Sequence, residues 1–207
     1  MALQRVRSPE LEHDVGRTPN LGYEPAGTYG FVRFLEHGFP NPLVRWHYHE
    51  EYELHLIVAT RGKVFVGDYI GQFEPGHLVL TGPRLPHNWI STEVPEGGVA
   101  LRDMVLQFAD APLRQAAAQI PELAEALPLL ERARYGIEFF GLSERMRERI
   151  TRVKQLHGLQ RFAEFTGLLG ELAGSNDYRL LSTVQLQSFD DDAALARISG
   201  IVDFLTE

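Results

Sequence analysis

Residues 46–91 read WHYHEEYELHLIVATRGKVFVGDYIGQFEPGHLVLTGPRLPHNWIS, and this stretch decides the fold class. Short apolar segments alternate in it with breaks that contain Gly or Pro, at 61–62, 75–76 and 82–86. Segments of the same kind extend on both sides, so the pattern predicts about eight short strands over residues 28–110. Many short strands joined by such turns favour an all-β sandwich or barrel.

The pattern becomes helical after Asp110, where apolar residues recur at helical spacing. The expected helices cover 111–120, 122–134, 143–157 and 159–173. Segment 135–142 is expected to be a short strand that returns to the β-domain, because apolar and more polar residues alternate there. Ser143 is the expected N-cap of the third helix. The third and fourth helices can form a hairpin around a turn at Gly158.

Both ends of the chain differ from this pattern. Residues 1–27 are rich in Pro, Gly and charge, and we expect an arm with little regular structure. Residues 187–192 (QSFDDD) indicate an exposed linker, and a last helix is expected over 193–206. The sequence therefore predicts an α+β chain, with a β-barrel followed by a helical hairpin region.

Composition limits the possible chemistry. The chain has 207 residues, 44% of them hydrophobic and 23% charged, and it has no cysteine. Any metal must therefore be held by His, Asp or Glu. The formal net charge of −8 argues against nucleic-acid binding by these residues alone. The sequence has neither an apolar run long enough for a membrane span nor an apolar N-terminal core, so a cytoplasmic protein is expected.

Histidines are the most informative residues, since five of the eight lie between positions 47 and 87. His47 and His49 are two apart on an expected strand and so share a face. Glu53 follows after a tight turn, and His87 comes from a later strand. These four side chains can surround one divalent transition metal, and imidazole with carboxylate suits Zn, Fe, Ni, Mn or Cu. The alternative is a set of histidines that bind an organic ligand or fill a polar core.

The spacing His47-Tyr48-His49-x3-Glu53 resembles the first motif of the cupin family. Counted from Gly76, His87 stands where the second cupin motif has its histidine. The turn-forming positions depart from the family pattern, with His77 in place of Asp, Gly82 in place of Pro and Arg84 in place of Gly. The resemblance implies a double-stranded β-helix barrel with a metal inside.

The wider pattern closely resembles the sensor half of AraC-type transcriptional regulators. The matching segments are Tyr52-Glu53-Leu54, Arg61-Gly62, Pro75-Gly76-His77-Leu78 and Pro86-His87-Asn88-Trp89. The resemblance implies a sensor barrel at 28–110, a helical dimerisation region at 111–186, and a linker with the start of a DNA-binding domain at 187–207. The two helix-turn-helix units that follow in that family are absent from this sequence, which is therefore expected to be a fragment.

Two further residues are candidates for a ligand pocket. His55 has the same strand parity as Glu53 and is expected to face the barrel interior. Trp89 is two residues after His87, so it is expected on the same face of the strand, where it can line the pocket. Core packing explains His55 and Trp89 equally well. His77 is expected to be exposed in its turn, and Arg102 is expected to be solvated.

Three functions are compatible with these observations. The favoured one is a regulatory sensor that binds a small-molecule effector or a metal, forms a homodimer, and reaches DNA only through a domain absent here. The second is a stand-alone cupin metalloenzyme, a dioxygenase or isomerase, with the same four ligands. The third is a structural dimerisation module with inert histidines, for which the helical hairpin is the motivation.

Overall fold

The computed structural model describes residues 9–11, 32–41 and 45–183. The expected linker at 187–192 and helix over 193–206 lie outside these residues, as does most of the expected arm. Within the arm, residues Glu10–Leu11 form a short strand that pairs in parallel with His47–Tyr48.

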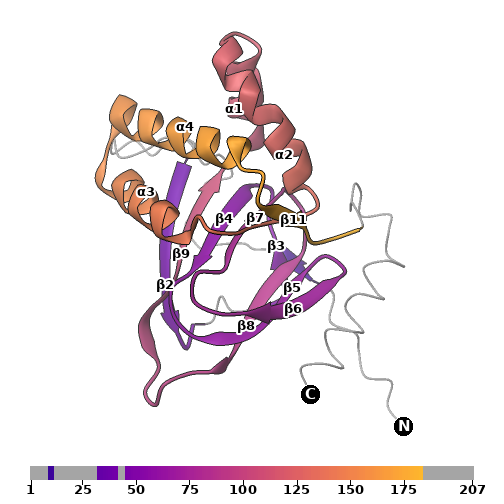
Figure 1. Ribbon diagram of the computed structural model, residues 1–207, viewed down its shortest axis with the longest axis vertical. Helices are drawn as coiled ribbons and strands as arrows, with labels where there is room; N and C mark the ends of the chain where they lie inside the picture. Colours follow the sequence, from indigo (N-terminus) through magenta and orange to yellow (C-terminus); the bar gives the residue numbers. More distant parts are fainter. Residues whose placement is uncertain (1–8, 12–31, 42–44, 184–207) are drawn as a thin grey trace.

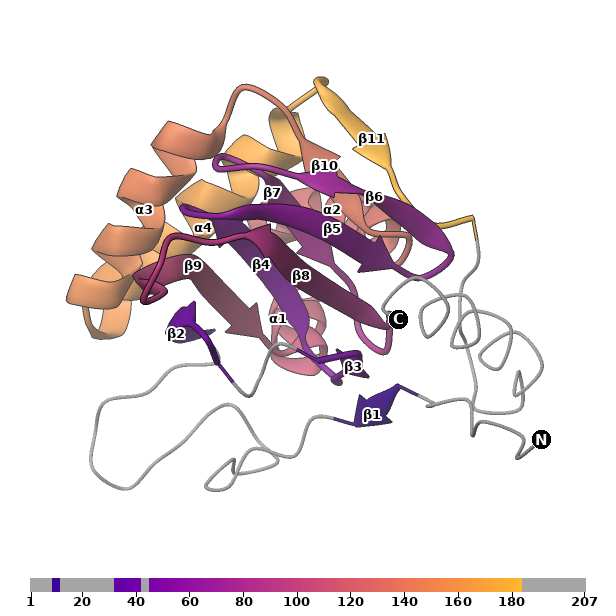
Figure 2. The ribbon, with the colours of Figure 1, turned by 90° about the horizontal axis from the view of Figure 1, so that it is seen from below.

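Two facing sheets make up the β-domain in the described part of the chain (Figures 1 and 2). The strands are β1 (Glu10–Leu11), β2 (Val32–Phe39), β3 (His47–Tyr48), β4 (Tyr52–Ile57), β5 (Arg61–Val66), β6 (Tyr69–Phe73), β7 (Leu78–Thr81), β8 (His87–Glu93), β9 (Val99–Phe108), β10 (Ile137–Phe139) and β11 (Tyr178–Leu180). One sheet has the order β1-β3-β8-β5-β6 and the other β11-β10-β7-β4-β9-β2. Apart from β1 with β3, neighbouring strands are antiparallel. This cupin-like sandwich, followed by helices, confirms the predicted α+β class.

The helices follow the sandwich, and two short strands return to it between and after them. The helical elements are α1 (Asp110–Ala117), the 3₁₀ helix η1 (Pro121–Ala126), α2 (Leu127–Ala133), α3 (Ser143–Gln155) and α4 (Gly158–Gly174). The helices α3 and α4 form the predicted hairpin, in which Arg149 makes ion pairs with Glu164 and Glu171 at 2.9 and 2.8 Å. The strand β10 returns to the sandwich, as predicted for segment 135–142, and pairs with β7. No helix in the described ranges is long and apolar enough to cross a membrane.

The strand β4 belongs to the six-stranded sheet, which lies as the middle layer between the helices and the five-stranded sheet. All six of its residues are buried. Tyr52, Leu54 and Leu56 pack with the helices in the larger apolar core. Glu53 and His55 alternate with them and face the five-stranded sheet. The six-stranded sheet is thus covered on both faces (Figure 2), and polar side chains on its inner face lie in the interior of the sandwich.

The turn predicted at Arg61–Gly62 was wrong, since both residues belong to β5. The chain turns just before them, where Thr60 has a φ of 73°. Gly62 is needed for strand pairing instead, because a Cβ there would lie 1.9 Å from the carbonyl oxygen of Ile90 on β8.

Two helix predictions also need correction. The single helix predicted over 122–134 is divided into η1 and α2, and Pro128, which has no N–H to donate, lies in the first turn of the second piece. Ser143 is the first residue of α3 rather than its cap. Leu142 occupies the N-cap position, and no side chain makes a capping hydrogen bond there.

Candidate metal centre

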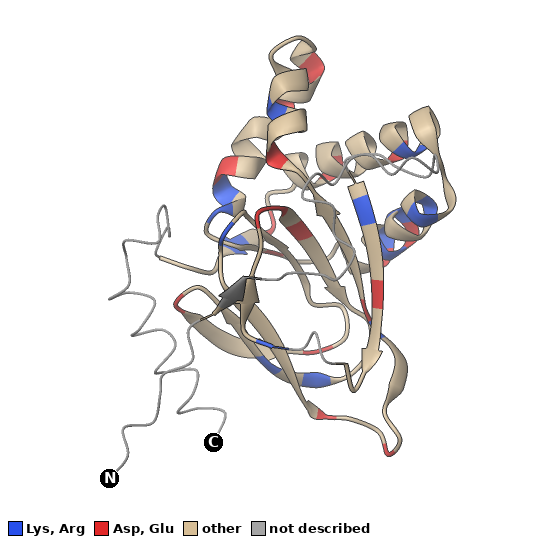
Figure 3. Ribbon diagram, turned by 180° about the vertical axis from the view of Figure 1, so that it is seen from behind, with Lys and Arg blue, Asp and Glu red and all other residues tan. Residues whose placement is uncertain are grey.

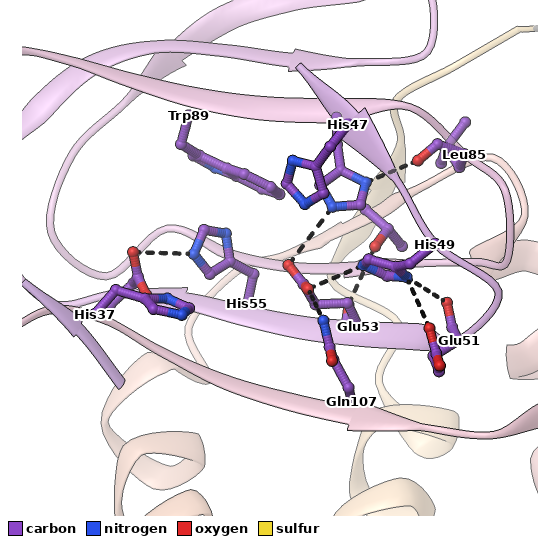
Figure 4. Close-up of polar contacts among 12 residues, drawn as sticks. His37, His47, His49, Glu51, Glu53, His55, Leu85, Trp89 and Gln107 are labelled. Carbon is purple, nitrogen blue, oxygen red and sulfur yellow. Dashed lines mark hydrogen bonds and ion pairs between the residues drawn. The ribbon is translucent and has the colours of Figure 1, made fainter. Parts of the chain in front are cut away.

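Three imidazoles meet at one end of the sandwich interior (Figure 4). His47 of β3 lies directly opposite His87 of β8 in the strand register, and His49 follows β3. The ring centroid of His87 is 4.5 Å from that of His47 and 4.9 Å from that of His49. One potential ligand atom from each residue lies within 4.8 Å of the other two, so the group can hold a metal ion.

Each of these rings is oriented by a backbone carbonyl two residues away. Nδ1 of His47 lies 2.7 Å from the carbonyl oxygen of Arg45, and Nδ1 of His87 lies 2.7 Å from that of Leu85. Nδ1 of His49 lies 3.1 Å from the carbonyl oxygen of Glu51. Because a carbonyl only accepts, the proton of the neutral ring is on Nδ1 in His47 and His87, and their Nε2 atoms carry the lone pair. His49 faces an acceptor at both ring nitrogens, since its Nε2 also lies 3.0 Å from a carboxylate oxygen of Glu53. Metal-binding histidines commonly have this arrangement.

Glu53 approaches the cluster from the opposite sheet, on β4. Its Oε2 lies 3.0 Å from Nε2 of His49, and its Oε1 lies 3.7 Å from Nε2 of His87. Gln107 of β9, which is opposite Glu53 in the register, donates a hydrogen bond of 2.9 Å to Oε2. Both His87 and Glu53 are buried, with exposed fractions of 0% and 5%. The candidate centre therefore joins the two sheets.

Electrostatics favour a cation at this point. Burial would raise the pKa of Glu53, but the hydrogen bond with His49 and the charges of the nearby histidines hold that pKa well below its ordinary value. Burial and the neighbouring His47 lower the pKa of His87 well below its ordinary value. The carboxylate of Glu53 thus faces the lone pair of Nε2 of His87, which has no hydrogen-bond partner among the described residues. A proton on His49 would stabilise only the contact between Nε2 of His49 and Glu53. A divalent cation can bind Nε2 of His87 and the carboxylate of Glu53 as well. The residues present fit a metal.

A small cavity of about 40 Å³ adjoins the cluster, and His47 and Glu53 line one part of it. Its volume corresponds to roughly two or three water molecules. His55 and Trp89, the predicted pocket residues, also line it, with their ring centroids 4.0 Å apart in an edge-on arrangement. Nδ1 of His55 has no hydrogen-bond partner among the described residues.

A buried ion pair that sequence reasoning missed lies at the same cavity. Arg102, expected to be solvated, is only 3% exposed. Its guanidinium donates to Oδ2 of Asp103 at 3.0 Å and to the carbonyl of Trp89. Asp103 also accepts from Nδ1 of His37 at 2.7 Å. Burial would raise the pKa of Asp103, but His55 and His37 hold it below its ordinary value.

The structure thus places the four predicted ligands together and both predicted pocket residues beside them. It also adds side chains of β9, namely Gln107, Arg102 and Asp103, whose positions depend on pairing with a distant strand. The available signal was the presence of three polar residues, Arg102, Asp103 and Gln107, within the otherwise apolar segment VALRDMVLQF. The expectation of an exposed His77 was wrong, since this side chain is 8% exposed.

Comparisons with known proteins give only distant likenesses. No protein-family model matches the chain, and no curated protein matches it. ToxT from Vibrio cholerae bound to (E)-4-(8-methylnaphthalen-1-yl)but-3-enoic acid superposes with a TM-score of 0.40 at 13% identity, covering 83% of this chain and 65% of that chain. A second ToxT structure gives 0.40 at 12% identity, covering 83% and 64%.

Streptomyces albus HEPD, with its substrate 2-hydroxyethylphosphonate and Fe(II) bound, gives a TM-score of 0.30 at 18% identity, covering 87% of this chain and 40% of that chain. The chain spans slightly less than two-thirds of the length of ToxT. At these identities and TM-scores, functional conclusions depend on the chain's own residues.

Proposed function

We propose that this chain is the effector-sensing and dimerisation portion of a cytoplasmic, bacterial-type transcriptional regulator. In this proposal the sandwich holds one divalent transition metal and receives a small molecule beside it. The observation that carries the proposal is the set of three imidazoles and one carboxylate, of which His47 is half-buried and the others are buried, next to a cavity that several polar residues line. The sequence resemblance to AraC-type sensor halves gives this site its regulatory setting.

His47, His49 and His87 would hold the metal, with Glu53 as a fourth ligand. The imidazole and carboxylate set suits Zn, Ni, Fe or Mn. When bound, the metal would act as a Lewis acid toward an oxygen or nitrogen of the effector. The protein's own part is to fix the rings through their Nδ1 contacts and to orient Glu53 through Gln107.

The cavity supports a sensing role because it presents more than metal ligands. His55 and Trp89 offer an imidazole and an aromatic wall, and Arg102 and Asp103 add a buried ion pair. A cavity of about 40 Å³ admits only a small group, so a larger effector would have to displace the surrounding side chains. Such a ligand would bind two arrangements with different affinity, which is the requirement for an allosteric sensor.

A contact path from the site to the helices also supports the proposal. Tyr52 immediately precedes Glu53 on β4, and its hydroxyl donates to Asp110, the first residue of α1, at 3.0 Å. Arg114 of α1 in turn makes an ion pair of 2.7 Å with Glu131 of α2. A change at Glu53 can therefore reach the helical region through its neighbour on the strand.

Dimerisation through the helical region is the third part of the proposal. The apolar stripe along 159–172 is largely used inside the chain, since Leu169 and Leu172 are buried in the core. Leu159, at the beginning of α4, is 85% exposed, and in this proposal it packs against the second protomer. Basic and acidic residues are interspersed over the described ribbon (Figure 3), and the proposal therefore places DNA contact in a separate domain.

Metal binding is the first test. The purified chain would be dialysed against Zn²⁺, Ni²⁺, Mn²⁺ and anaerobic Fe²⁺ in turn, and bound metal counted by mass spectrometry. We expect one ion per chain, lost in His47→Ala and in His87→Ala and retained in the control His157→Ala, whose side chain is exposed. Equal metal binding by the unmodified chain and all three variants would overturn the metal site.

The natural reading frame beyond Glu207 would also be sequenced, and a basic region with two helix-turn-helix patterns is expected there.

A stand-alone cupin metalloenzyme is the second candidate, and the cavity beside the ligands favours it, because a small reactant could lie against the metal. Oxygen uptake by the iron-loaded protein would be measured with phenols, thiols and diketones. Turnover that is lost in His87→Ala, together with a stop codon after Glu207, would favour the enzyme over the sensor.

A further inference from the structure

A second concave site lies outside the sandwich interior. Several of its lining residues come from β5, β6 and β10, whose places in the fold can be followed in Figure 2. This groove has a volume of about 670 Å³, within the range of small-molecule sites. It is lined by side chains from both sheets and from the turn before β7. Two of its polar lining residues, His77 and Glu138, are buried, with exposed fractions of 8% and 7%.

The hydrogen bond from Trp89 fixes the tautomer of His77. Nε1 of Trp89 donates to Nδ1 of His77 at 3.2 Å. An indole N–H can only donate, so Nδ1 carries the lone pair and the proton of the neutral ring is on Nε2. Burial, with the charges of His55 and Arg179, lowers the pKa of His77 to about 3, which keeps the ring neutral at physiological pH.

This leaves a buried N–H without an acceptor. Nε2 of His77 has no hydrogen-bond partner among the described residues. The nearest carboxylate oxygen, Oε1 of Glu138, lies 3.6 Å away, which is too long for a hydrogen bond. The other oxygen of Glu138 accepts from Arg179 at 2.6 Å. Two residues that line the groove therefore hold a buried donor and an acceptor 3.6 Å apart, spaced for one atom that can accept from the first and donate to the second.

A hydroxyl group has this chemistry, because its oxygen accepts while its hydrogen donates. An anion would face the carboxylate of Glu138 at close range, and an aprotic acceptor would leave that carboxylate oxygen without a donor. Phe140, which lines the same groove and is 39% exposed, offers an aromatic face for a ring. We propose that this groove is a second ligand site, which binds a neutral hydroxylated aromatic compound through His77 and Glu138.

This proposal is independent of the metal centre and of the regulatory function. Trp89 nevertheless touches both sites, because it lines the inner cavity and donates to His77. A ligand that binds His77 is therefore expected to change the NMR signal of the Trp89 indole N–H, which donates to the same ring. The chain has only two tryptophans, so the second, Trp46, serves as an internal reference.

The test uses the full chain and two matched probes. Binding of 4-fluorophenol and of 4-fluoroanisole, whose oxygen cannot donate, would be followed by ¹⁹F NMR. Indole N–H signals of ¹⁵N-labelled protein would be recorded in the same titrations. We expect 4-fluorophenol to bind at least about tenfold more tightly than 4-fluoroanisole, and to shift the Trp89 signal while the Trp46 signal stays in place.

Variants locate the binding. Glu138→Leu removes the acceptor, and Phe140→Ala removes an exposed wall without disturbing the core, so each is expected to weaken 4-fluorophenol binding. Leu180→Ala, another exposed apolar side chain that does not line the groove, is the control and should bind as the unmodified protein does. Equal binding of the two probes, unchanged binding by both groove variants, or no binding at millimolar concentration would each overturn the proposal.

Discussion

The hydroxyl of Tyr52 lies 3.0 Å from Oδ1 of Asp110 and donates to it. Arg114 completes a triangle, with Nε 2.6 Å from the same carboxylate oxygen and Nη2 3.2 Å from the hydroxyl. Burial and the charge of Asp110 raise the pKa of Tyr52 to about 12, so this hydroxyl stays protonated. The triangle connects the strand that carries Glu53 to the first helix after the sandwich.

Replacing Tyr52 with Phe tests the strength of this connection. The ring is fully buried and stacks on Phe108, so Tyr52→Phe keeps the packing and removes only the hydroxyl. We expect the free energy of unfolding to fall by about 1–2 kcal/mol, because the hydrogen bond donated to Asp110 and the one accepted from Arg114 are both lost. Urea denaturation would measure this change in the free energy of unfolding, with Tyr135→Phe as the control. No loss of stability relative to that control would show that the triangle contributes nothing.

Gln107 is expected to affect metal affinity without being a ligand. Its amide donates to Oε2 of Glu53 at 2.9 Å, and supporting groups of this kind typically change metal affinity by about 10- to 100-fold. Gln107→Leu should therefore weaken binding of Zn²⁺ at least about tenfold while one ion still binds per chain. Competition with a chromophoric chelator would measure the affinity. Gln155→Leu, at an exposed position of α3, should leave the affinity unchanged.

The grouping of the four candidate ligands could be predicted, three of them from local rules and His87 from its position in a segment that resembles the second cupin motif. Strand parity places His47 and His49 on one face, and a tight turn brings Glu53 back toward them. Gln107 and Arg102 could not be predicted in the same way. They come from β9, about fifty residues beyond Glu53, and the long-range register that pairs Glu53 with Gln107 is not encoded in any short motif.

His77 shows a second limit of sequence reasoning. It follows Pro75-Gly76, and a residue in such a turn is ordinarily exposed. It is buried because β10 returns after α1, η1 and α2 and pairs with β7, which places Phe139 opposite Leu78 and Glu138 near the imidazole. The return of β10 to the β-domain was predicted, but its pairing with β7, which buries His77, was not.

The buried pair Arg102–Asp103 should be far more costly to break than a surface pair. Asp103→Ala leaves a guanidinium that is 3% exposed without its carboxylate, and breaking such a pair typically costs about 3–5 kcal/mol. The exposed pair Arg61–Glu74, with side chains 59% and 73% exposed, is the comparison. Glu74→Ala should change the free energy of unfolding by less than about 1 kcal/mol. Similar losses in the two variants would contradict this assignment of buried charge.

Asp68 provides the clearest pH dependence. It follows Gly67 in the turn between β5 and β6, and its carboxylate accepts hydrogen bonds from the hydroxyl of Ser182 at 2.7 Å and from the N–H and hydroxyl of Thr183. Burial would raise the pKa of Asp68, but these hydrogen bonds outweigh it, and the pKa in the folded protein is lowered. The hydrogen bonds between this turn and the segment after β11 are therefore strongest while Asp68 is ionised.

A carboxyl whose pKa is lower in the folded than in the unfolded chain stabilises the fold above the unfolded value, near 3.8. This contribution is lost as the pH falls through the folded pKa. At pH 7 we therefore expect Asp68→Asn to be less stable than the unmodified protein, with a gap that closes on acidification below about pH 4. Urea denaturation at a series of pH values would measure the gap, and Asp177→Asn, an exposed carboxylate, is the control. A gap that stays constant through the acid range would mean that Asp68 acts through the shape of the turn, because only a charge-dependent contribution can disappear with protonation.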